Sequence, residues 1–535
     1  MRRLFAEGGL SRLNRMMRRS LPDPDRLLAA AAFDADFYLA ANPDVGSAGV
    51  DPLTHFLEFG WREGRDPTRD FSLDAYLQAF PDVAKLQVNP FVHYLKAGRP
   101  RLLPAESPLG FRHEILERLV PLETRVAAVR AMPAPCAPAE PLTAALAAAD
   151  RGLHITFSHD DFTAHLGGLQ AALQREAARV TAEGRDHLHL HPANAWPVVR
   201  TAVEPGALGV VWNGRRLGVY AASTVAGALA AAPRRGGARS FAIHSLLGHA
   251  AEETGDILEA AGLSEGVFWL HDFASLCAGF HLLRDDVEDC AAPPPDSAAC
   301  GVCVYGPWRG RHLAAHAQLF ARLKLTVAAP SRATLDLWRR STTLPAVATL
   351  ILPHARLSPI GAAPIRAGRP FRLAYAGLPV AHKGWPVFQA LAVKHFDDPR
   401  YEFLHLGART AANLPIEFQR VIAGPADPLA MRNALAAAEV DAVLIWPLCR
   451  ETFSYVAYEA VAAGCAVLTG PDSGNVADFV AEGGQGQVLA DEQALADAFA
   501  GGDILALARA RRRPMLYDLA FSALTPDLAE HGRAA

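Results

Sequence analysis

Short apolar segments and helical segments alternate in the last third of the chain, and this rhythm constrains the fold more than any other feature. The segments typical of buried strands are 371–376, 402–406, 442–445 and 466–469. The helical segments between them are 385–394, 429–438 and 455–463. Strands that are separated by single helices return to the same sheet in the same direction, so the alternation predicts a parallel, doubly wound α/β sheet.

Two glutamates stand eight positions apart, Glu451 and Glu459, around the start of the helix expected from Tyr455. The first N–H groups of a helix, here from Thr452 to Tyr455, have no partner within the helix and can bind an anion. Eight residues at 3.6 per turn place Glu459 two turns further on, rotated by roughly 80°. A phosphate at the helix start and a carboxylate beside it for sugar hydroxyls describe a nucleotide-sugar pocket.

A second α/β domain is expected upstream, from about residue 152 to residue 340. Its first strand, His154–Ser158, leads into a turn that contains Gly167 and Gly168. These glycines let the backbone come close to a ligand at the start of the next helix, near Leu169. A Gly-Gly pair is otherwise only a turn, so its position after the first strand is what favours ligand binding.

Two further apolar strands of this domain end in polar residues, one before His244 and the other before His271 and Asp272. Ligands of open α/β sheets bind beyond the carboxyl ends of the strands, so these side chains are expected at the edge of a cleft. An imidazole and a carboxylate can orient a sugar hydroxyl and take its proton. The alternative is that Asp272 caps the next helix while His271 packs beside it.

Three segments resemble, in the expected order, blocks of the retaining, nucleotide-sugar-dependent glycosyltransferases of family 4 (glycosyltransferase group 1). They are 153–170 with the Gly-rich turn, 371–385 with a phosphate loop, and 451–479 with the E-x7-E signature. The resemblance implies the GT-B fold, in which two Rossmann-like domains face a cleft. It also implies retention at the anomeric carbon, without an essential catalytic metal.

The resemblance assigns roles to individual residues. Glu459 would hold the ribose hydroxyls, Glu451 would contact the transferred sugar, and Lys383 would stabilise the departing diphosphate. His271, Asp272 and Glu451 are therefore the expected catalytic residues. The expected donor-binding residues are Gly167, Gly168, Gly377, Lys383, Gly384, Thr452, Phe453, Ser454 and Glu459.

The sequence departs from the family pattern at two positions of the donor site. The arginine expected after Gly377 is Leu378, so one cation is missing, and Arg450 or His382 are candidates to replace it. The small residue usually found three positions after the first glutamate is Ser454, whose hydroxyl can contact a phosphate or crowd it. These departures affect the identity of the donor more than the activity.

Four cysteines lie close together in the sequence, at Cys277, Cys290, Cys300 and Cys303, the last two as a C-x2-C pair. Thiolates in such a group can hold a structural zinc ion in a tetrahedral site, and related transferases carry a similar cysteine-rich insert. The alternative is four free, buried cysteines, because the spacing is not that of a standard zinc finger. A catalytic metal is not expected.

A repeat with a constant offset of 38 residues occupies residues 31–100. Its matching positions include Pro43 and Pro81, and His55 and His93. Each unit is expected to form a helix, a Pro-Asp turn and a second helix, and the two units can bury each other's apolar faces. The histidines lie in apolar strings and are interpreted as core residues rather than metal ligands. The block resembles a repeat that accompanies polysaccharide-synthesis glycosyltransferases, which implies a docking module.

The first 30 residues combine arginines with leucine and methionine at helical spacing, as in Arg12, Leu13, Arg15 and Met16. A helix of this type can lie on an anionic membrane surface, whereas the alternative is a solvated terminus. No apolar segment reaches the roughly 20 residues of a membrane-spanning helix. We therefore expect a cytoplasmic protein, for which attachment to the inner face of the cytoplasmic membrane through the basic N-terminus is one of these two alternatives.

The expected organisation comprises six segments. They are a basic N-terminus (1–30), two helical repeats (31–100), a Pro- and Ala-rich linker (101–150), an acceptor-side Rossmann-like domain with the cysteine-rich insert (151–355), a nucleotide-sugar-binding domain (356–510), and a C-terminal helix and tail (511–535), with the helix expected near Leu516. At 535 residues and 51% hydrophobic composition, the chain can bury more than one core.

The predicted activity is transfer of a sugar from a nucleotide-sugar donor to a glycan or lipid-linked acceptor during surface polysaccharide synthesis. The net charge of −4 gives no general signature of a nucleic-acid partner. One alternative is a non-catalytic GT-B protein that binds glycan or scaffolds a synthesis complex, suggested by Leu378 and the repeats. The other is a sugar-nucleotide epimerase, which the E-x7-E block disfavours.

Overall fold

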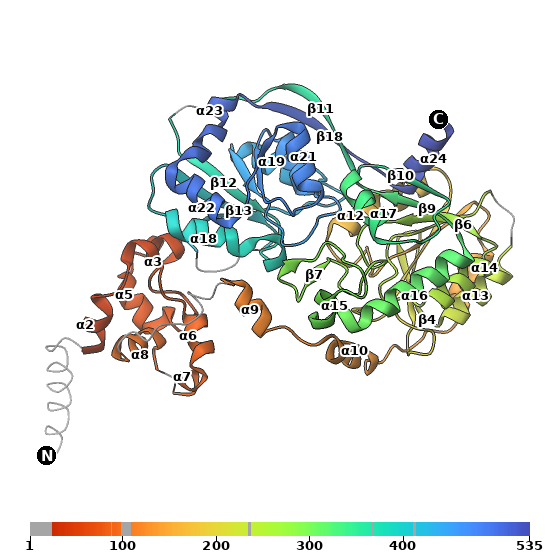
Figure 1. Ribbon diagram of the computed structural model, residues 1–535, viewed down its shortest axis with the longest axis horizontal. Coiled ribbons are helices and arrows are strands. Elements are labelled where there is room, and N and C mark those ends of the chain that lie inside the picture. Colours follow the sequence, from red (N-terminus) through yellow and green to blue (C-terminus); the bar gives the residue numbers. More distant parts are fainter. Residues whose placement is uncertain are drawn as a thin grey trace, which may run out of the picture.

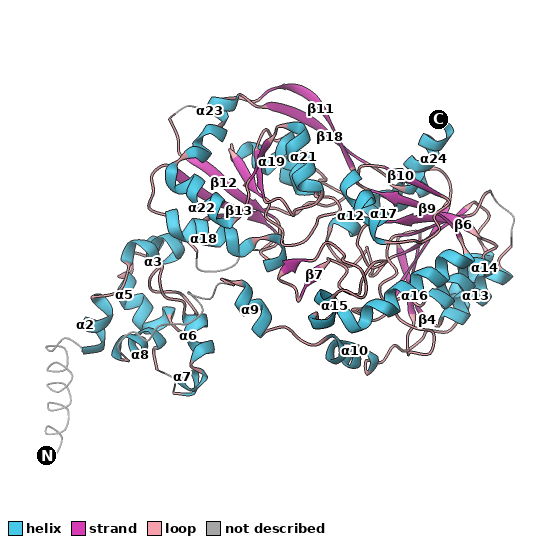
Figure 2. Ribbon diagram, in the orientation of Figure 1, coloured by secondary structure: helices cyan, strands magenta, loops and turns pink. Residues whose placement is uncertain are grey.

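The computed structural model describes residues 24–86, 88–97, 109–233, 237–365, 368–409 and 414–534. Two α/β domains face each other, and a small helical region lies beside the second of them (Figure 1, Figure 2). This is the GT-B architecture predicted from the sequence. Most of the predicted basic N-terminus, up to residue 23, lies outside the described residues.

An eight-stranded sheet forms the first domain, in the order β10-β9-β6-β5-β1-β2-β3-β4. Its strands are β1 Leu153–Phe157, β2 Asp186–Pro192, β3 Leu208–Trp212, β4 Arg215–Tyr220, β5 Ser240–Ile243, β6 Glu265–Trp269, β9 Lys324–Ala329 and β10 Ala348–Ile351. Neighbouring strands are parallel except at β2–β3 and β3–β4. The covering helices are α12 Gly168–Ala182, α13 Ala222–Ala231, α14 Ala251–Ala260, α16 Gly306–Arg322 and α17 Arg332–Ser341.

The second domain has a six-stranded, fully parallel sheet in the order β14-β13-β12-β15-β16-β17. Its strands are β12 Phe371–Ala376, β13 Tyr401–Gly407, β14 Glu417–Arg420, β15 Ala442–Leu444, β16 Ala466–Thr469 and β17 Gly486–Val488. Helices α18 Trp385–His395 and α22 Glu492–Gly501 contribute to one core cluster. Helices α19 Ala430–Ala437, α20 Tyr455–Ala462 and α21 Asn475–Gly483 contribute to a second.

The two domains are joined by a two-stranded antiparallel ribbon. Strand β11, Ala355–Ala362, leaves the first domain and pairs with β18, Met515–Phe521, which returns to it (Figure 1). The last helix, α24 Thr525–Ala534, follows, and Trp269 Nε1 donates to Thr525 Oγ1 at 3.1 Å. We expected a helix near Leu516, and this prediction is wrong, because the segment is held as a strand by its pairing with β11.

The repeats form a helical unit whose buried side chains make one core cluster. The elements are α2 Pro24–Ala30, α3 Ala35–Ala41, α4 Pro43–Ser47, α5 Pro52–His55, the π-helix η1 Phe56–Gly60, α6 Leu73–Ala79, α7 Pro81–Lys85 and α8 Pro90–Lys96. The Pro-Asp positions start short helices rather than turns, since proline fits the first helical position. His55 Nδ1 contacts the Tyr38 hydroxyl at 2.9 Å and His93 Nδ1 contacts that of Tyr76 at 2.7 Å, so both histidines serve the core, as expected.

The repeat unit contacts the end of α18 in the second domain. The Arg69 guanidinium lies 4.3 Å from the ring centre of Phe396 and bonds Asp397 at 3.1 Å, while Phe37 meets the same ring edge-on. The linker that follows contains α9 Arg112–Glu117, α10 Leu122–Arg130 and α11 Glu140–Ala147. The repeats are therefore attached to the second domain by an aromatic contact with a charged rim.

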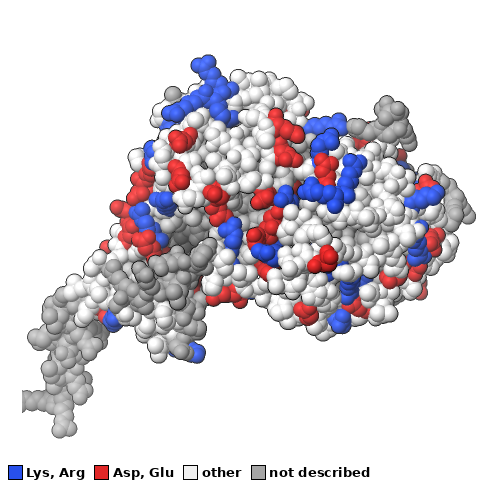
Figure 3. Space-filling model, in the orientation of Figure 1, with Lys and Arg blue, Asp and Glu red and all other residues white. Residues whose placement is uncertain are grey.

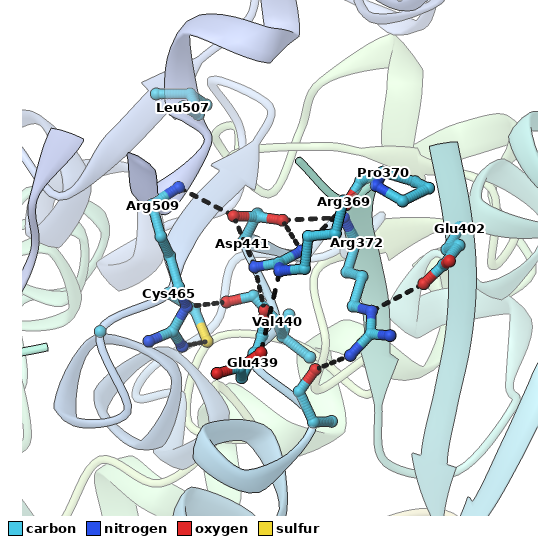
Figure 4. Close-up of polar contacts among 12 residues, drawn as sticks. Arg369, Pro370, Arg372, Glu402, Glu439, Val440, Asp441, Cys465, Leu507 and Arg509 are labelled. Carbon is cyan, nitrogen blue, oxygen red and sulfur yellow. Dashed lines mark hydrogen bonds and ion pairs between the residues drawn. The ribbon is translucent and has the colours of Figure 1, made fainter. Parts of the chain in front are cut away.

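A buried carboxylate holds together the edge of the second domain where β12 and β15 begin (Figure 4). Asp441 is 2% exposed and accepts hydrogen bonds from the Arg369 side chain at 2.7 Å, from the Arg372 backbone N–H at 2.9 Å and from the Arg509 backbone N–H at 2.8 Å. Arg509 belongs to the short helix α23, Arg509–Arg512. One side chain thus joins the start of β12, the start of β15 and the C-terminal segment.

Acidic and basic side chains are interspersed over most of the face drawn in Figure 3. Over most of this face, therefore, neither sign of charge forms a continuous field. Among the residues that the structure describes, we find no helix with the length and apolar character needed to cross a bilayer.

Candidate functional site

A cavity of about 190 Å³ lies between the two domains, and both contribute to its walls. Seven of the residues predicted from the sequence line it: Gly168, His271, Asp272, Lys383, Glu451, Thr452 and Phe453. The first three follow strand ends or open a helix of the first domain, and the other four lie at the carboxyl ends of β12 and β15. The topology therefore brings both sets to one place, as parallel sheets do with their ligand-binding loops.

Lys383 and Glu451 form an ion pair in this cavity, with Nζ and Oε1 2.5 Å apart. Their side chains are 40% and 13% exposed. Burial disfavours the ammonium, but the Glu451 carboxylate outweighs it and raises the pKa of Lys383 above its usual value. The cation that we expected to face a diphosphate is thus neutralised by the carboxylate that we expected to face the sugar.

The N–H groups from Thr452 to Tyr455 have no hydrogen-bond acceptor within the described part of the chain. Ser454 instead caps α20, because its hydroxyl accepts from the N–H of Ala457 at 3.3 Å. The Thr452 hydroxyl donates to the carbonyl of His271 at 2.9 Å, which links the two domains. The start of α20 therefore keeps open donors toward the cleft, as the sequence predicted.

Glu459 lies on α20, 6% exposed, and does not line the cavity. Burial raises the pKa of its carboxyl to about 7, although Arg175 partly opposes the shift. The unfolded chain ionises this group above about pH 4.5, whereas the folded chain keeps the proton until about pH 7. Folding therefore loses stability as the pH rises from 4.5 to 7.

Glu459→Gln removes this titration. We expect the melting temperature of the variant, relative to that of the wild type, to increase between pH 5 and pH 7 and to level off above pH 7. Differential scanning calorimetry across this range measures it, with Glu482→Gln as the control because Glu482 is exposed. A difference that does not change with pH would mean that the buried carboxyl is already ionised at pH 5.

The two candidates for the missing cation are both engaged elsewhere. Arg450 bonds Asp289 of the first domain at 2.8 Å and Asp472 at 3.2 Å. His382 stacks on His281 with ring centres 5.3 Å apart, and burial lowers its pKa, so it is neutral at pH 7. Neither side chain takes the place of the arginine that is missing at position 378. Arg450 instead links the second domain to the first.

The two glycines of the phosphate loop have defined structural roles. Gly377, at the end of β12, has φ +121° and its carbonyl accepts from His405 Nε2 at 2.9 Å. Gly384 has φ +86°, and its N–H donates to the carbonyl of Ala381 at 2.9 Å. We expected the Gly384 amide to face the diphosphate, but the 3-10 turn η3, Ala381–Lys383, uses this donor.

A side chain at position 384 would have no room. A Cβ there would lie 2.1 Å from the carbonyl oxygen of Trp446. Gly384→Ala is expected to destabilise the second domain by more than the control Gly368→Ala, which has φ +81° but open space around it. The control should cost about 1–2 kcal/mol from backbone strain alone. Chemical denaturation compares the two, and equal losses would show that the Trp446 carbonyl moves aside freely.

The Gly-rich turn of the first domain approaches a protein side chain. A Cβ on Gly168 would lie 3.3 Å from the ring of Tyr455, whose hydroxyl accepts from Arg175 at 2.7 Å. Gly167 precedes α12 with an extended backbone, and a Cβ there would meet the Gln170 side chain. The close approach that these glycines permit is filled by Tyr455 of the second domain.

His271 and Asp272 line the cavity but do not bond to each other. Both nitrogens of His271 contact other rings, His244 Nδ1 at 2.9 Å and His354 Nε2 at 3.2 Å. Asp272 accepts from the Ser245 hydroxyl at 2.8 Å and from the Ala274 N–H at 2.9 Å. The side chain of Asp272 thus closes a local turn, whereas the helix that our alternative interpretation placed after it is absent, since residues 273–282 contain no helix.

Sequence reasoning missed His354, Arg175 and Tyr455 as parts of the site. His354 stands just before the ribbon strand β11, where no motif marks it. Arg175 lies in the middle of α12, and Tyr455 occupies an unremarkable position after the first glutamate. The signal that could have found them is their place next to strand ends and helix starts that face the cleft.

The four cysteines of the insert line one small cavity in the first domain. The insert also contains β7 Leu283–Arg284, β8 Glu288–Asp289 and α15 Ala298–Val302. Burial raises the pKa of the Cys277, Cys290 and Cys303 thiols, and Arg309 contacts Cys300 Sγ at 3.0 Å. Within the described ranges, no three His, Cys, Asp or Glu side chains are placed to hold a metal ion. A structural zinc ion stays a prediction, which elemental analysis of the purified protein tests.

No known family model matches the sequence, and no curated protein matches it. Solved structures resemble the chain weakly. Sucrose-phosphate synthase from Thermosynechococcus elongatus is 14% identical over 68% of this chain and 92% of its own, with a TM-score of 0.42. Anabaena HepE with bound UDP and glucose is 12% identical over 72% and 100%, with a TM-score of 0.41. WaaG, a glycosyltransferase involved in lipopolysaccharide biosynthesis, is 14% identical over 68% and 94%, with a TM-score of 0.35. Likeness at this level concerns the fold and carries no functional assignment.

Proposed function

We propose that the chain is a retaining glycosyltransferase that moves a sugar from a nucleotide-sugar donor to a glycan or lipid-linked acceptor. The observation that carries this proposal is the cavity between the domains. It combines the open N–H groups of α20, the Lys383 ammonium and the Glu451 carboxylate on one wall with the His271 and His354 imidazoles on the other. Donors for a diphosphate, a carboxylate for a sugar and an imidazole for an acceptor are the groups that such a transfer uses.

The departing nucleoside diphosphate develops negative charge, which the N–H groups from Thr452 to Tyr455 and the Lys383 ammonium are suited to stabilise. Binding of the diphosphate would draw Lys383 away from Glu451. The freed carboxylate would then accept hydrogen bonds from the hydroxyls of the transferred sugar. Glu459, buried one turn beyond Tyr455, would meet the ribose once the donor is seated, and no protein nucleophile is required.

Donor entry needs the two domains to part. Thr452 and Arg450 bond residues of the first domain, and Tyr455 covers Gly168. We infer that the described state is closed and that the ribbon of β11 and β18 is the hinge. Closure would exclude water from the activated sugar, as in other enzymes with moving domains.

A calorimetric and thermal-shift screen of the full chain against UDP-, GDP-, dTDP- and CMP-sugars tests the donor site. We expect one nucleotide to bind selectively and both Lys383→Ala and Glu459→Ala to lose that binding. Sugar transfer onto a lipid or glycan acceptor would then be followed by mass spectrometry. Conversion of the donor to an epimer without any acceptor would instead identify an epimerase.

A non-catalytic scaffold is the second candidate. The Lys383–Glu451 ion pair, the apolar Leu378 and the Tyr455 ring against Gly168 all occupy space or charge that a donor would need. The repeats, attached beside Phe396, are suited to hold a partner. Absence of binding to every nucleotide sugar by the folded chain would favour this scaffold over the enzyme.

A further inference from the structure

A chain of imidazoles runs from the cavity into the interior of the first domain. Nδ1 of His271 lies 3.2 Å from Nε2 of His354, and Nε2 of His271 lies 2.9 Å from Nδ1 of His244. The other nitrogen of His244, Nε2, lies 2.9 Å from Oε2 of Glu176, an ion-pair distance at an angle outside hydrogen-bond geometry. His154 contacts the same carboxylate at 3.1 Å. Three strand ends, β1, β5 and β6, thus connect a buried acid to the cleft.

The Glu176 carboxylate is fully buried, and so is the ring of His244. A buried carboxylate is stable only when a positive charge or several hydrogen bonds compensate it. No lysine or arginine among the described residues forms an ion pair with Glu176, so the two imidazoles are its partners. Glu176 is therefore the negative charge that faces these two rings inside the domain.

The Glu176 end of the imidazole chain determines which way its N–H groups point. A neutral imidazole has one N–H and one lone pair. When His244 keeps its proton on Nε2 toward Glu176, its Nδ1 accepts from His271, and Nδ1 of His271 in turn accepts from Nε2 of His354. Nδ1 of His354 then carries a lone pair, and this atom is buried without a partner in the described part of the chain.

A buried polar atom without a partner requires an explanation, because leaving it unpaired costs about 1–3 kcal/mol. His354 is 3% exposed and lines the cavity between the domains. The rings that cover it, Phe453 at 5.1 Å and Tyr455 at 6.1 Å, both belong to the second domain. Both rings move with the second domain, so a ligand bound between the domains would hold them away from Nδ1 and offer it a partner.

We propose that Nδ1 of His354 takes the proton of the acceptor hydroxyl and that His271 and His244 pass the charge to Glu176. The inference rests on the proposed glycosyl transfer. The hydroxyl O–H bond breaks as its oxygen bonds the anomeric carbon, and the nucleoside diphosphate leaves with the electron pair of the bond it breaks. The Nε2 proton of His354 moves to Nδ1 of His271, and the Nε2 proton of His271 moves to Nδ1 of His244.

The positive charge then rests on His244 beside Glu176, and it returns by the reverse path when product leaves. His354 is the catalytic residue of this step, whereas Glu176, His244 and His271 are positioning residues. Burial lowers the pKa of His354 to about 3 and also lowers that of His271, so both rings are neutral and able to accept at pH 7. Burial disfavours the ionised Glu176, but His244 and His154 outweigh it and keep its pKa well below the usual value.

Other charged groups face the imidazole chain on several sides. Arg175 of α12 acts on His354, and His159 acts on His271. Arg185 and His187 lie near the Glu176 end, with Arg185 bonded to Ser240, which itself contacts His154 Nδ1 at 2.8 Å. Both arginines oppose an additional positive charge, so Glu176 is the group that makes uptake of a proton favourable.

The coupling of the rings is measured without any substrate. The full chain is labelled with ¹⁵N in its histidine rings, and each signal is assigned by a single histidine substitution. In Glu176→Gln, the ring nitrogens of His244, His271 and His354 should all shift, whereas Glu183→Gln, exposed at the end of the same helix, should shift none of them. A change confined to His154 and His244 would overturn the relay.

The catalytic role is measured by kcat as a function of pH with the donor found in the binding screen. Glu176→Gln should lower kcat by about 100-fold while the donor dissociation constant stays unchanged. Loss of the negative charge lowers the proton affinity of the imidazole chain. The acid limb of the profile of kcat against pH should therefore move to lower pH. His354→Gln, which removes the receiving nitrogen, provides a second variant and should lower kcat similarly.

The two ways to fail are distinguishable. Transfer by the wild type with unchanged kcat and pH profile in both variants would overturn this inference and leave the proposed function intact. Absence of donor binding and of transfer in the wild type would remove the proposed function, and the catalytic role of His354 with it. Coupled ring shifts together with a lowered kcat would establish the relay.

Discussion

Lys383→Ala is expected to weaken binding of a free nucleoside diphosphate by about 10- to 100-fold, whereas Glu451→Gln is expected to tighten it. A hydrogen bond to a charged group contributes about 1.5–3 kcal/mol, which corresponds to the loss in the first variant. In the second variant, the Lys383 ammonium no longer has the carboxylate that now lies 2.5 Å from it. The diphosphate then binds beside a Lys383 ammonium that no longer pairs with Glu451, and one negative charge that would repel it is gone.

Isothermal titration calorimetry with UDP and GDP, with and without the attached sugar, measures both effects. Lys394→Ala on α18 is the matched control, because Lys394 is exposed and does not line the cavity. Glu451→Gln should increase the affinity for the sugar nucleotide less than the affinity for the free diphosphate, because the contact of the carboxylate with the sugar is lost. If Glu451→Gln weakened both ligands equally, Glu451 would hold the diphosphate region in place rather than compete for Lys383.

Much of the second domain could be predicted because its signals are local. The observed strands Phe371–Ala376 and Ala466–Thr469 coincide with the predicted segments, and the helix Tyr455–Ala462 ends within one residue of its prediction. Each of these elements buries a short apolar segment next to a turn or cap that the sequence displays. The amides at the start of α20, which have no acceptor within the described residues, followed from the helix alone, whereas anion binding there stays a prediction.

Features that depend on distant pairing could not be predicted. Leu516 was expected in a helix, but it lies in a strand that pairs with β11, more than 150 residues earlier. The Lys383–Glu451 ion pair and the contact of Tyr455 with Gly168 join segments whose relative positions only the closed domains fix. The imidazole chain likewise joins residues from three strands and the ribbon, and no local pattern indicates which of the 20 histidines will meet.

The contacts of Asp441 also join distant segments, so the sequence does not predict them. Asp441→Ala, at the edge of the second domain opposite the cleft, is expected to destabilise the protein by about 3–5 kcal/mol. Removing one partner of a buried ion pair leaves the other charge uncompensated, which produces losses of this size. Asp441 is 2% exposed and serves the Arg369 guanidinium together with the N–H groups of Arg372 and Arg509 (Figure 4). In the variant, the N–H groups of Arg372 and Arg509 lose this acceptor, and the Arg369 guanidinium keeps only its contacts with Pro370 and Glu439.

Unfolding by urea, followed by the fluorescence of Trp385 and Trp446 in this domain, measures the loss. Glu402→Ala is the control, because Glu402 accepts from Arg372 Nε at 2.7 Å but is 40% exposed, and exposed pairs contribute about 0–1 kcal/mol. A loss for Asp441→Ala no larger than for the control would mean that water enters and satisfies the three donors. The expected difference instead places the stability of the second domain at the edge opposite its cleft. The loops around Lys383 and Glu451 then remain free to exchange their mutual ion pair for a ligand.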